Sequence, residues 1–249
     1  MGTNKSKLIS YYAMRQLIGV LNILLPFLCW GINAFINNLN ILKNSFFVDK
    51  ANTLNYNPGD NLKSSISHFY YTSSGPLFTG ILITVSVFLF CYVGYKRNKK
   101  EDRYSWITDN GITNFAAICA LGIVVFPTAS EHEITDNIHI FVSSKFVGWL
   151  HFGSAALFFM STAILSIVNF RRNPSKKLIN GTEGKLFLIC GWGIILSLVI
   201  IAISIGFMNG REWFSGKFVY IMEVVMLLFF GIAWLVKGKS RLTQQLLKH

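Results

Sequence analysis

The segment Leu186–Met208, with the sequence LFLICGWGIILSLVIIAISIGFM, holds no charged residue and decides the class of this protein. An α-helix rises about 1.5 Å per residue, so about 20 apolar residues are needed to cross a bilayer core of about 30 Å. A helix also satisfies its backbone hydrogen bonds within the segment, as the hydrocarbon region requires. Residues 186–208 therefore predict a transmembrane helix.

Five further segments of similar character predict more such helices. The chain is 52% hydrophobic, which excludes an ordinary soluble domain, and it shows no alternating barrel pattern. We expect an all-α integral membrane protein in which residues 1–249 form one six-transmembrane-helix domain. The expected spans are residues 17–36, 76–95, 112–127, 146–170, 186–208 and 218–236.

The positive charges predict the orientation of these spans. The N-terminal segment, the second and fourth connections and the C-terminal tail hold 17 of the 23 Lys and Arg residues. Because cytoplasmic loops are enriched in Lys and Arg, we expect both termini in the cytoplasm and the protein in the inner (or plasma) membrane. A basic rim facing anionic lipid accounts for the net charge of +12, so the charge does not indicate a nucleic-acid partner.

The first expected outer connection, residues 37–75, contains the turn signal Asn57-Pro58-Gly59-Asp60 and then a helical pattern. Apolar side chains recur at helical spacing on one side, at Leu62, Ile66, Phe69 and Tyr70. The other side carries polar residues: Ser64, Ser65, His68, Tyr71 and Thr72. We therefore expect a short amphipathic helix that lies at the membrane interface before the second span.

Two ionisable residues, His151 and Glu223, fall inside expected spans. Each comes six residues after a lysine that marks the outer boundary, Lys145 and Lys217 respectively. At about 1.5 Å per residue both side chains lie roughly 9 Å deep, so they would meet if the fourth and sixth expected helices pack together. Because a buried ionisable group in lipid is costly, the pair is a hypothesis for a functional site.

Other polar residues reach the same side of the membrane. Asn33 lies near the outer end of the first span, and His68 and Thr128 would form the mouth of the pocket. Asn33, Thr128 and Thr72 are the expected substrate-binding residues. The hydroxyl groups that could act as a nucleophile belong to Ser65, Ser67 and Thr72.

Three interpretations of this cluster stay open. In the first, Glu223 and His151 pair with each other, or with Asn33, and lock the bundle. In the second, Glu223 orients His151, which acts as a general base for a hydroxyl nucleophile or for water. In the third, the cluster passes a proton, an ion or a small solute.

Metal binding is a variant of the catalytic interpretation, and zinc is the metal that imidazole and carboxylate would suit. No HExxH or HxxxH pair is present, so two ligands on one helical face are missing. No cofactor is therefore specified. The candidate ligands on the outer side are His68, Glu131, His132, Glu133, Asp136, His139 and His151.

Short motifs in a fixed order carry a resemblance to a known family. They are Ile66-Ser67-His68-Phe69-Tyr70-Tyr71-Thr72, Phe126-Pro127-Thr128, Leu150-His151-Phe152 and Gly231-Ile232-Ala233-Trp234-Leu235-Val236-Lys237-Gly238. Together they resemble an uncharacterised bacterial six-span family that is distantly similar to the DRAM/Sfk membrane proteins, whose eukaryotic members include GPI-anchor lipid-remodelling factors. The resemblance implies a six-helix bundle and a lipid-related role, and it transfers no catalytic residue.

A looser resemblance is to the alkaline ceramidase and progestin-receptor-like superfamily of membrane hydrolases. It rests on Ser67, His68 and His151, which are similar to the serine and zinc-binding histidines of that group. This chain departs from the pattern, because it has six expected spans instead of seven and lacks the paired histidines on the last helix.

The expected function is binding or modification of a lipid at an outer-leaflet polar pocket. If the protein is an enzyme, it is a membrane-embedded lipid hydrolase or transferase in which His151, Glu223, Ser67 and His68 are the catalytic candidates and the Ile66–Thr72 helix gates entry. The alternatives are a transporter or channel subunit and a non-catalytic scaffold subunit of a membrane complex. The expected partners are membrane lipid and a second membrane protein or another copy of this chain.

Overall fold

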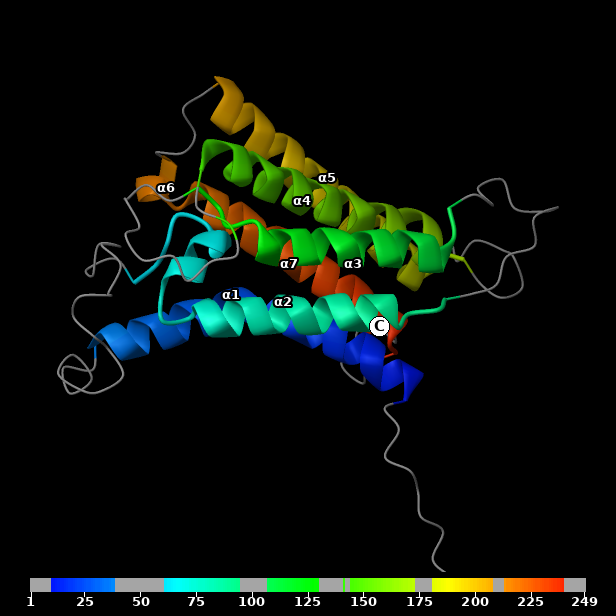
Figure 1. Cartoon of the computed structure of the whole chain (residues 1–249). Coiled ribbons are helices and arrows are strands. Elements are labelled where there is room, and N and C mark those ends of the chain that lie inside the picture. Colours follow the sequence, from blue (N-terminus) through cyan, green and yellow to red (C-terminus); the bar gives the residue numbers. More distant parts are fainter. Residues whose placement is uncertain are drawn as a thin grey trace, which may run out of the picture.

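The computed structural model describes residues 10–38, 61–94, 107–129, 141, 144–172, 181–207 and 213–239. Six long helices form its body (Figure 1). They are α1 (Tyr11–Asn38), α2 (Gly75–Phe90), α3 (Asp109–Val125), α4 (Lys145–Ile164), α5 (Thr182–Phe207) and α7 (Phe218–Lys237). Three short elements complete the described part: the 3-10 helix η2 (Ile66–Tyr71), the π-helix η3 (Leu165–Phe170) and α6 (Trp213–Gly216).

Four helical segments in this described part are long and apolar enough to cross a membrane. They are Tyr11–Ile36, Lys145–Phe170, Thr182–Phe207 and Phe218–Lys237. Helices α2 and α3 are also apolar but shorter, with 16 and 17 residues. The class is therefore a helical membrane protein, as the composition predicts.

The two shorter helices end earlier than expected for local reasons. The second span is expected to reach residue 95, but α2 ends at Phe90, and Gly94 then turns the chain with a φ of 58°. Helix α3 ends at Val125 because a residue before proline disfavours the helical region, and Phe126 before Pro127 is extended. At its start, the Thr108 side chain accepts a hydrogen bond from the Gly111 N–H, which begins the helix three residues before position 112.

The six long helices form a closed ring in chain order. Each packs on the next one along the chain, and α7 packs back on α1. Consecutive helices run in opposite directions along the bundle (Figure 1). Glycines bring α1 and α7 close, since a Cβ added at Gly231 would lie 2.7 Å from the Gly19 carbonyl oxygen. In this ring α4 and α7 are not neighbours, because α5 lies between them in the packing order.

The segment expected to lie at the interface is instead inserted into one end of the ring. Helix η2 packs against α1, α2 and α7, and its Ile66 and Phe69 side chains are buried in the hydrophobic core. A 3-10 helix has three residues per turn, so Ile66 and Phe69 share one face. Its polar residues are not exposed as expected: Ser65 and Tyr71 are buried and bond to other elements. We call the end that holds η2 the outer end, and the opposite end, at Asp109 and Lys237, the inner end.

Candidate functional site

A serine–histidine pair lies at the outer end. The Ser67 Oγ is 2.8 Å from the His151 Nε2, and the His151 Nδ1 is 2.8 Å from the Phe126 carbonyl oxygen. A carbonyl oxygen only accepts, so Nδ1 carries the proton in that bond. In the neutral ring Nε2 is then an acceptor, and the Ser67 hydroxyl donates to it. This is the arrangement in which an imidazole can take a proton from a serine hydroxyl.

The end of α3 fixes the imidazole. The last carbonyl groups of a helix have no partner within it. Because α3 stops before Pro127, the Phe126 carbonyl is free of the helical pattern and accepts from His151 on α4. His151 is 2% exposed, so its ring is enclosed by protein. A main-chain carbonyl thus occupies the orienting position that a carboxylate has in the Ser-His-Asp triad.

The Glu223 side chain holds the segment that carries Ser67. The Glu223 Oε2 accepts from the Ile66 N–H at 2.6 Å, and the Ser65 Oγ donates to both carboxylate oxygens at 3.0 Å. The Ser65 Oγ in turn accepts from the Ser67 N–H at 3.2 Å. Glu223 therefore anchors the start of η2, which carries Ser67.

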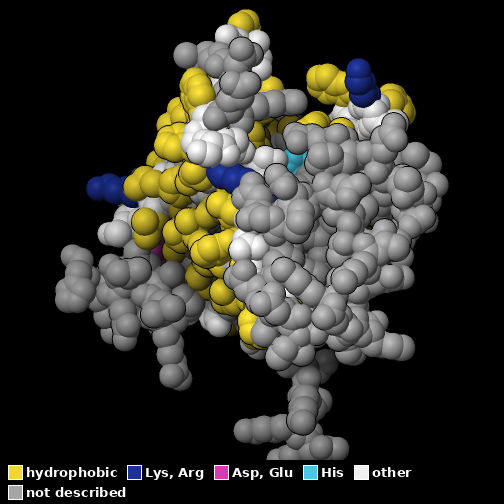
Figure 2. Space-filling model, turned by 90° about the vertical axis from the view of Figure 1, so that its left-hand side faces the viewer, with side chains coloured by type: hydrophobic (Ala, Val, Ile, Leu, Met, Phe, Trp, Pro, Cys, Tyr) yellow, Lys and Arg dark blue, Asp and Glu magenta, His cyan; other side chains and the backbone are white. Residues whose placement is uncertain are grey.

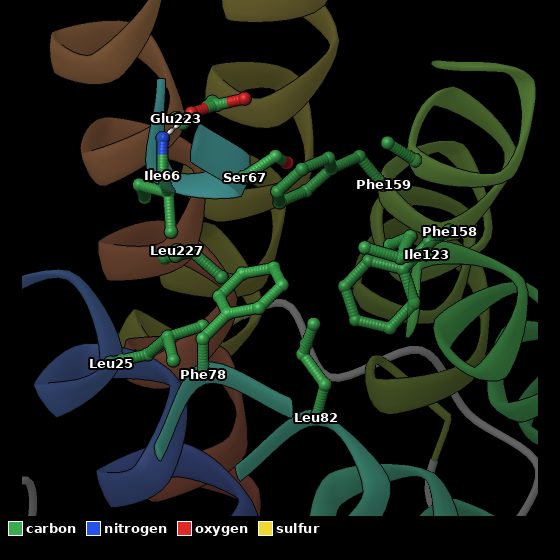
Figure 3. A pocket seen from close by; sticks show the side chains of 11 residues that line it. Leu25, Ile66, Ser67, Phe78, Leu82, Ile123, Phe158, Phe159, Glu223 and Leu227 are labelled. Carbon is green, nitrogen blue, oxygen red and sulfur yellow. Dashed lines mark hydrogen bonds between the residues drawn. The ribbon is translucent and has the colours of Figure 1, made fainter. Parts of the chain in front are cut away.

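An apolar chamber adjoins the serine. The cavity has a volume of about 40 Å³, and Ser67 and Glu223 line it at one end. Figure 3 shows these two residues on the same side of the chamber as Ile66, with aliphatic and aromatic side chains around the rest. The other lining residues are Leu25, Ile66, Phe78, Leu82, Ile123, Ala155, Phe158, Phe159 and Leu227.

The expected pairing of His151 with Glu223 is wrong. Both ring nitrogens of His151 are engaged by Ser67 and Phe126, and the Glu223 carboxylate bonds to η2. The physical reason is the packing order, since α5 lies between α4 and α7 in the ring. The aromatic contact that α4 and α7 do share, Phe158 against Phe230, lies about two helical turns deeper than His151. Glu223 thus neither locks the bundle through His151 nor orients the imidazole. The two residues instead meet the same short helix from opposite sides.

The other predicted site residues lie nearby but outside the described lining of the chamber. The Asn33 Nδ2 donates to the Asn61 carbonyl at 3.0 Å, which holds the chain that leads into η2. The Thr72 hydroxyl donates to the Phe69 carbonyl and accepts from the Ser74 N–H, so it caps the end of η2. Thr128 is buried and accepts through its carbonyl from the Tyr71 hydroxyl.

His68 does not join His151. Its Nδ1 is 2.7 Å from the Ser64 hydroxyl oxygen, on the half-buried side of η2. Figure 2 looks onto the outer end, where hydrophobic side chains dominate the surface of the described residues. Within the described ranges no group of three His, Cys, Asp or Glu side chains could hold a metal ion. The loop candidates Glu131, His132, Glu133, Asp136 and His139 lie outside those ranges.

Sequence reasoning missed a second polar cluster, at the inner end. Arg15, Asp109, Asn169 and Lys237 are each 8% exposed or less. The Asn169 Nδ2 donates to the Asp109 Oδ1 at 2.6 Å, Arg15 donates to the Lys237 carbonyl at 3.2 Å, and the Lys237 Nζ donates to the Phe170 carbonyl at 3.0 Å. The cluster thereby joins α1, α3, α7 and η3. These charges sit at or beyond the expected span limits, where sequence favours a solvated position.

Comparison with known proteins gives no relative for this chain. No family model matches its sequence, no curated protein matches it, and no solved structure matches its fold.

Proposed function

We propose that this protein is a membrane-embedded serine hydrolase or acyltransferase that acts on a lipid ester, with Ser67 as the nucleophile and His151 as the general base. The observation that carries the proposal is the 2.8 Å contact between the Ser67 Oγ and the His151 Nε2, beside an apolar chamber. A nucleophile within hydrogen-bond reach of a base that a third group orients is the signature of covalent catalysis. The apolar lining favours a hydrocarbon group in the substrate, and the apolar helices around the site favour a lipid.

In the proposed reaction, the Ser67 Oγ attacks the carbonyl carbon of the ester while its proton passes to the His151 Nε2. The C–O bond to the alcohol then breaks, and the alcohol leaves with that proton. An acyl group remains on Ser67. Water or a lipid hydroxyl, deprotonated by His151, attacks this acyl group and releases a carboxylic acid or a new ester, and Ser67 regains its proton.

The membrane setting is part of the proposal. With 16 and 17 residues, α2 and α3 are about 24 and 26 Å long, close to a bilayer core of about 30 Å, and we propose that they are the second and third of six spans. The excess of basic residues in the terminal segments and the second and fourth connections supports cytoplasmic termini, in the inner or plasma membrane. Ser67 and the chamber beside it then lie on the outer-leaflet side, and the resemblance to the DRAM/Sfk proteins supports the same lipid-related role.

The test is covalent labelling of the purified protein in nanodiscs with methyl phosphonofluoridate. The Ser67 oxygen would form a bond to phosphorus, its proton would pass to His151, and fluoride would leave. Intact-mass spectrometry would detect one adduct. We expect the adduct on wild type and none on Ser67→Ala, and labelling of His151→Gln slower by about 10²-fold or more. Ser86→Ala is the control, because Ser86 is also buried and its hydroxyl donates to the Ala117 carbonyl instead of to a histidine. Equal labelling of wild type and Ser67→Ala, or no adduct on wild type, would exclude the proposal.

A further inference from the structure

The chamber runs from the Ser67–His151 pair toward the middle of the bundle. Ser67 and Glu223 line its outer end. On α2, Leu82 lies one helical turn, about 6 Å, deeper than Phe78, and on α7 Leu227 lies one turn deeper than Glu223. Figure 3 shows Leu82 on the side of the chamber away from Ser67 and Glu223. The chamber is thus a pocket that extends inward from the nucleophile, with large side chains along its deep part.

The position of the chamber suits the acyl part of a substrate. A carbonyl carbon at the Ser67 Oγ would have its chain directed either into this pocket or out toward the lipid. Away from Ser67 and Glu223, the aliphatic and aromatic side chains that line the pocket offer no hydrogen bond. A hydroxylated or charged substrate group placed there would lose its hydration without compensation. The pocket extends inward from the Ser67 hydroxyl, and its lining is apolar. Both features suit a hydrocarbon chain attached to the substrate carbonyl that Ser67 attacks.

The volume limits the length of that chain. An apolar cavity of about 150 Å³ holds one benzene molecule, with six carbons. The chamber has about 40 Å³, about a quarter of that volume. Building on the proposed function, we infer that the acyl group transferred through Ser67 is short, with a chain of about one or two carbons, and that Leu82 and its neighbours at the deep end set this limit. The lipid is then the alcohol that carries or receives the short acyl group.

The experiment measures labelling rates with methyl, butyl and octyl phosphonofluoridates, whose alkyl group occupies the place of the acyl chain. One misplaced methylene in an apolar pocket changes rates about 10- to 200-fold, so we expect wild type to react with the methyl probe at least about tenfold faster than with the octyl probe. Leu82→Ala should extend the pocket and speed the butyl and octyl reactions. Leu89→Ala, at a buried leucine of the same helix outside the lining, should leave the order unchanged.

A second variant covers the case in which Leu82→Ala does not fold. Ala155 lines the chamber from α4 and is only partly buried, so Ala155→Val should narrow it, slowing the butyl reaction more than the methyl one. Equal rates for the three probes on wild type, or an order unaffected by both chamber variants, would overturn the short-acyl inference and leave the proposed function standing. No adduct from any probe on wild type would instead remove the proposed function itself, and the inference with it.

Discussion

The two ends of this bundle both bury polar side chains, but they arrange them differently. At the inner end Arg15, Asp109, Asn169 and Lys237 bond to one another or to main-chain carbonyls, and they join four elements. At the outer end Glu223 and His151 hold a short helix between them, and the hydroxyl of Ser67 faces a chamber. Both ends thus bury ionisable side chains. The outer end differs because the Ser67 hydroxyl, in contact with His151, lies beside a chamber.

The comparison teaches that burial alone does not identify a functional site. An ionisable group within a membrane protein is a functional candidate by default. The inner cluster meets that criterion more strongly, with Arg15, Asp109 and Lys237 all buried. Its hydrogen bonds nevertheless serve helix packing, which we expect to appear as stability. The outer cluster should contribute less to stability and more to reactivity.

The largest expected effect is on the inner cluster. Asp109→Ala removes the acceptor of Asn169 and one of the two acidic groups, with Glu183, whose charges act on the buried Lys237 ammonium. Losing an opposite charge beside a buried one costs about 3–5 kcal/mol. We expect the free energy of unfolding in mixed micelles to fall by that amount. Asn110→Ala, at the exposed neighbouring position of α3, is the control. A loss below about 1 kcal/mol would mean that this cluster does not hold the bundle.

The next effect tests how the serine is held. Glu223→Ala removes the acceptor of the Ile66 N–H and the Ser65 hydroxyl, and leaving a buried donor without its partner costs about 1–3 kcal/mol. We expect a loss of stability in that range together with slower phosphonofluoridate labelling of Ser67. Glu223→Gln, which keeps one acceptor, should recover part of both. Labelling that stays at the wild-type rate in Glu223→Ala would show that the carboxylate does not position Ser67.

Much of the fold follows from the sequence for a local reason. Length and hydropathy depend on neighbouring residues, and the expected segments 186–208 and 218–236 match α5 and α7 within a few residues. The expected length of α2 failed because the apolar pattern continues past Phe90 to Val93, while the backbone turns at Gly94. Apolar composition predicts a span better than it predicts where the helix within that span ends.

The sequence predicts the depth at which the site residues lie, but not their hydrogen-bond partners. Spacing from Lys145 and Lys217 placed His151 and Glu223 in one layer, and both do contact η2. Their partners depend on which helices are neighbours, and no local pattern states that α5 separates α4 from α7. The inner cluster was missed because Asp109 and Lys237 sit at helix ends, where charged side chains commonly reach solvent.

A smaller effect should come from the nucleophile itself. Ser67→Ala removes one neutral hydrogen bond to His151, which contributes about 0.5–1.5 kcal/mol. We expect a change in unfolding free energy within that range and complete loss of labelling, the reverse of the result at Asp109. A loss comparable to that of Asp109→Ala would give the Ser67–His151 pair a structural role instead, and the contrast between the two ends would disappear.

The smallest expected effect is the coupling between the two ends. The 16 residues of α2 correspond to about 24 Å along the bundle, and substitutions more than about 10 Å apart without shared partners add within about 0.3–0.5 kcal/mol. Asp109→Ala combined with Ser67→Ala should therefore lose the sum of the single losses. Ser65→Ala with Glu223→Ala should lose less than their sum, because each substitution breaks the same two hydrogen bonds. A difference above about 1 kcal/mol between the loss of the Asp109→Ala/Ser67→Ala double variant and the sum of the single losses would mean that the two ends share one cooperative network. Reactivity at Ser67 would then depend on the charges at the inner end.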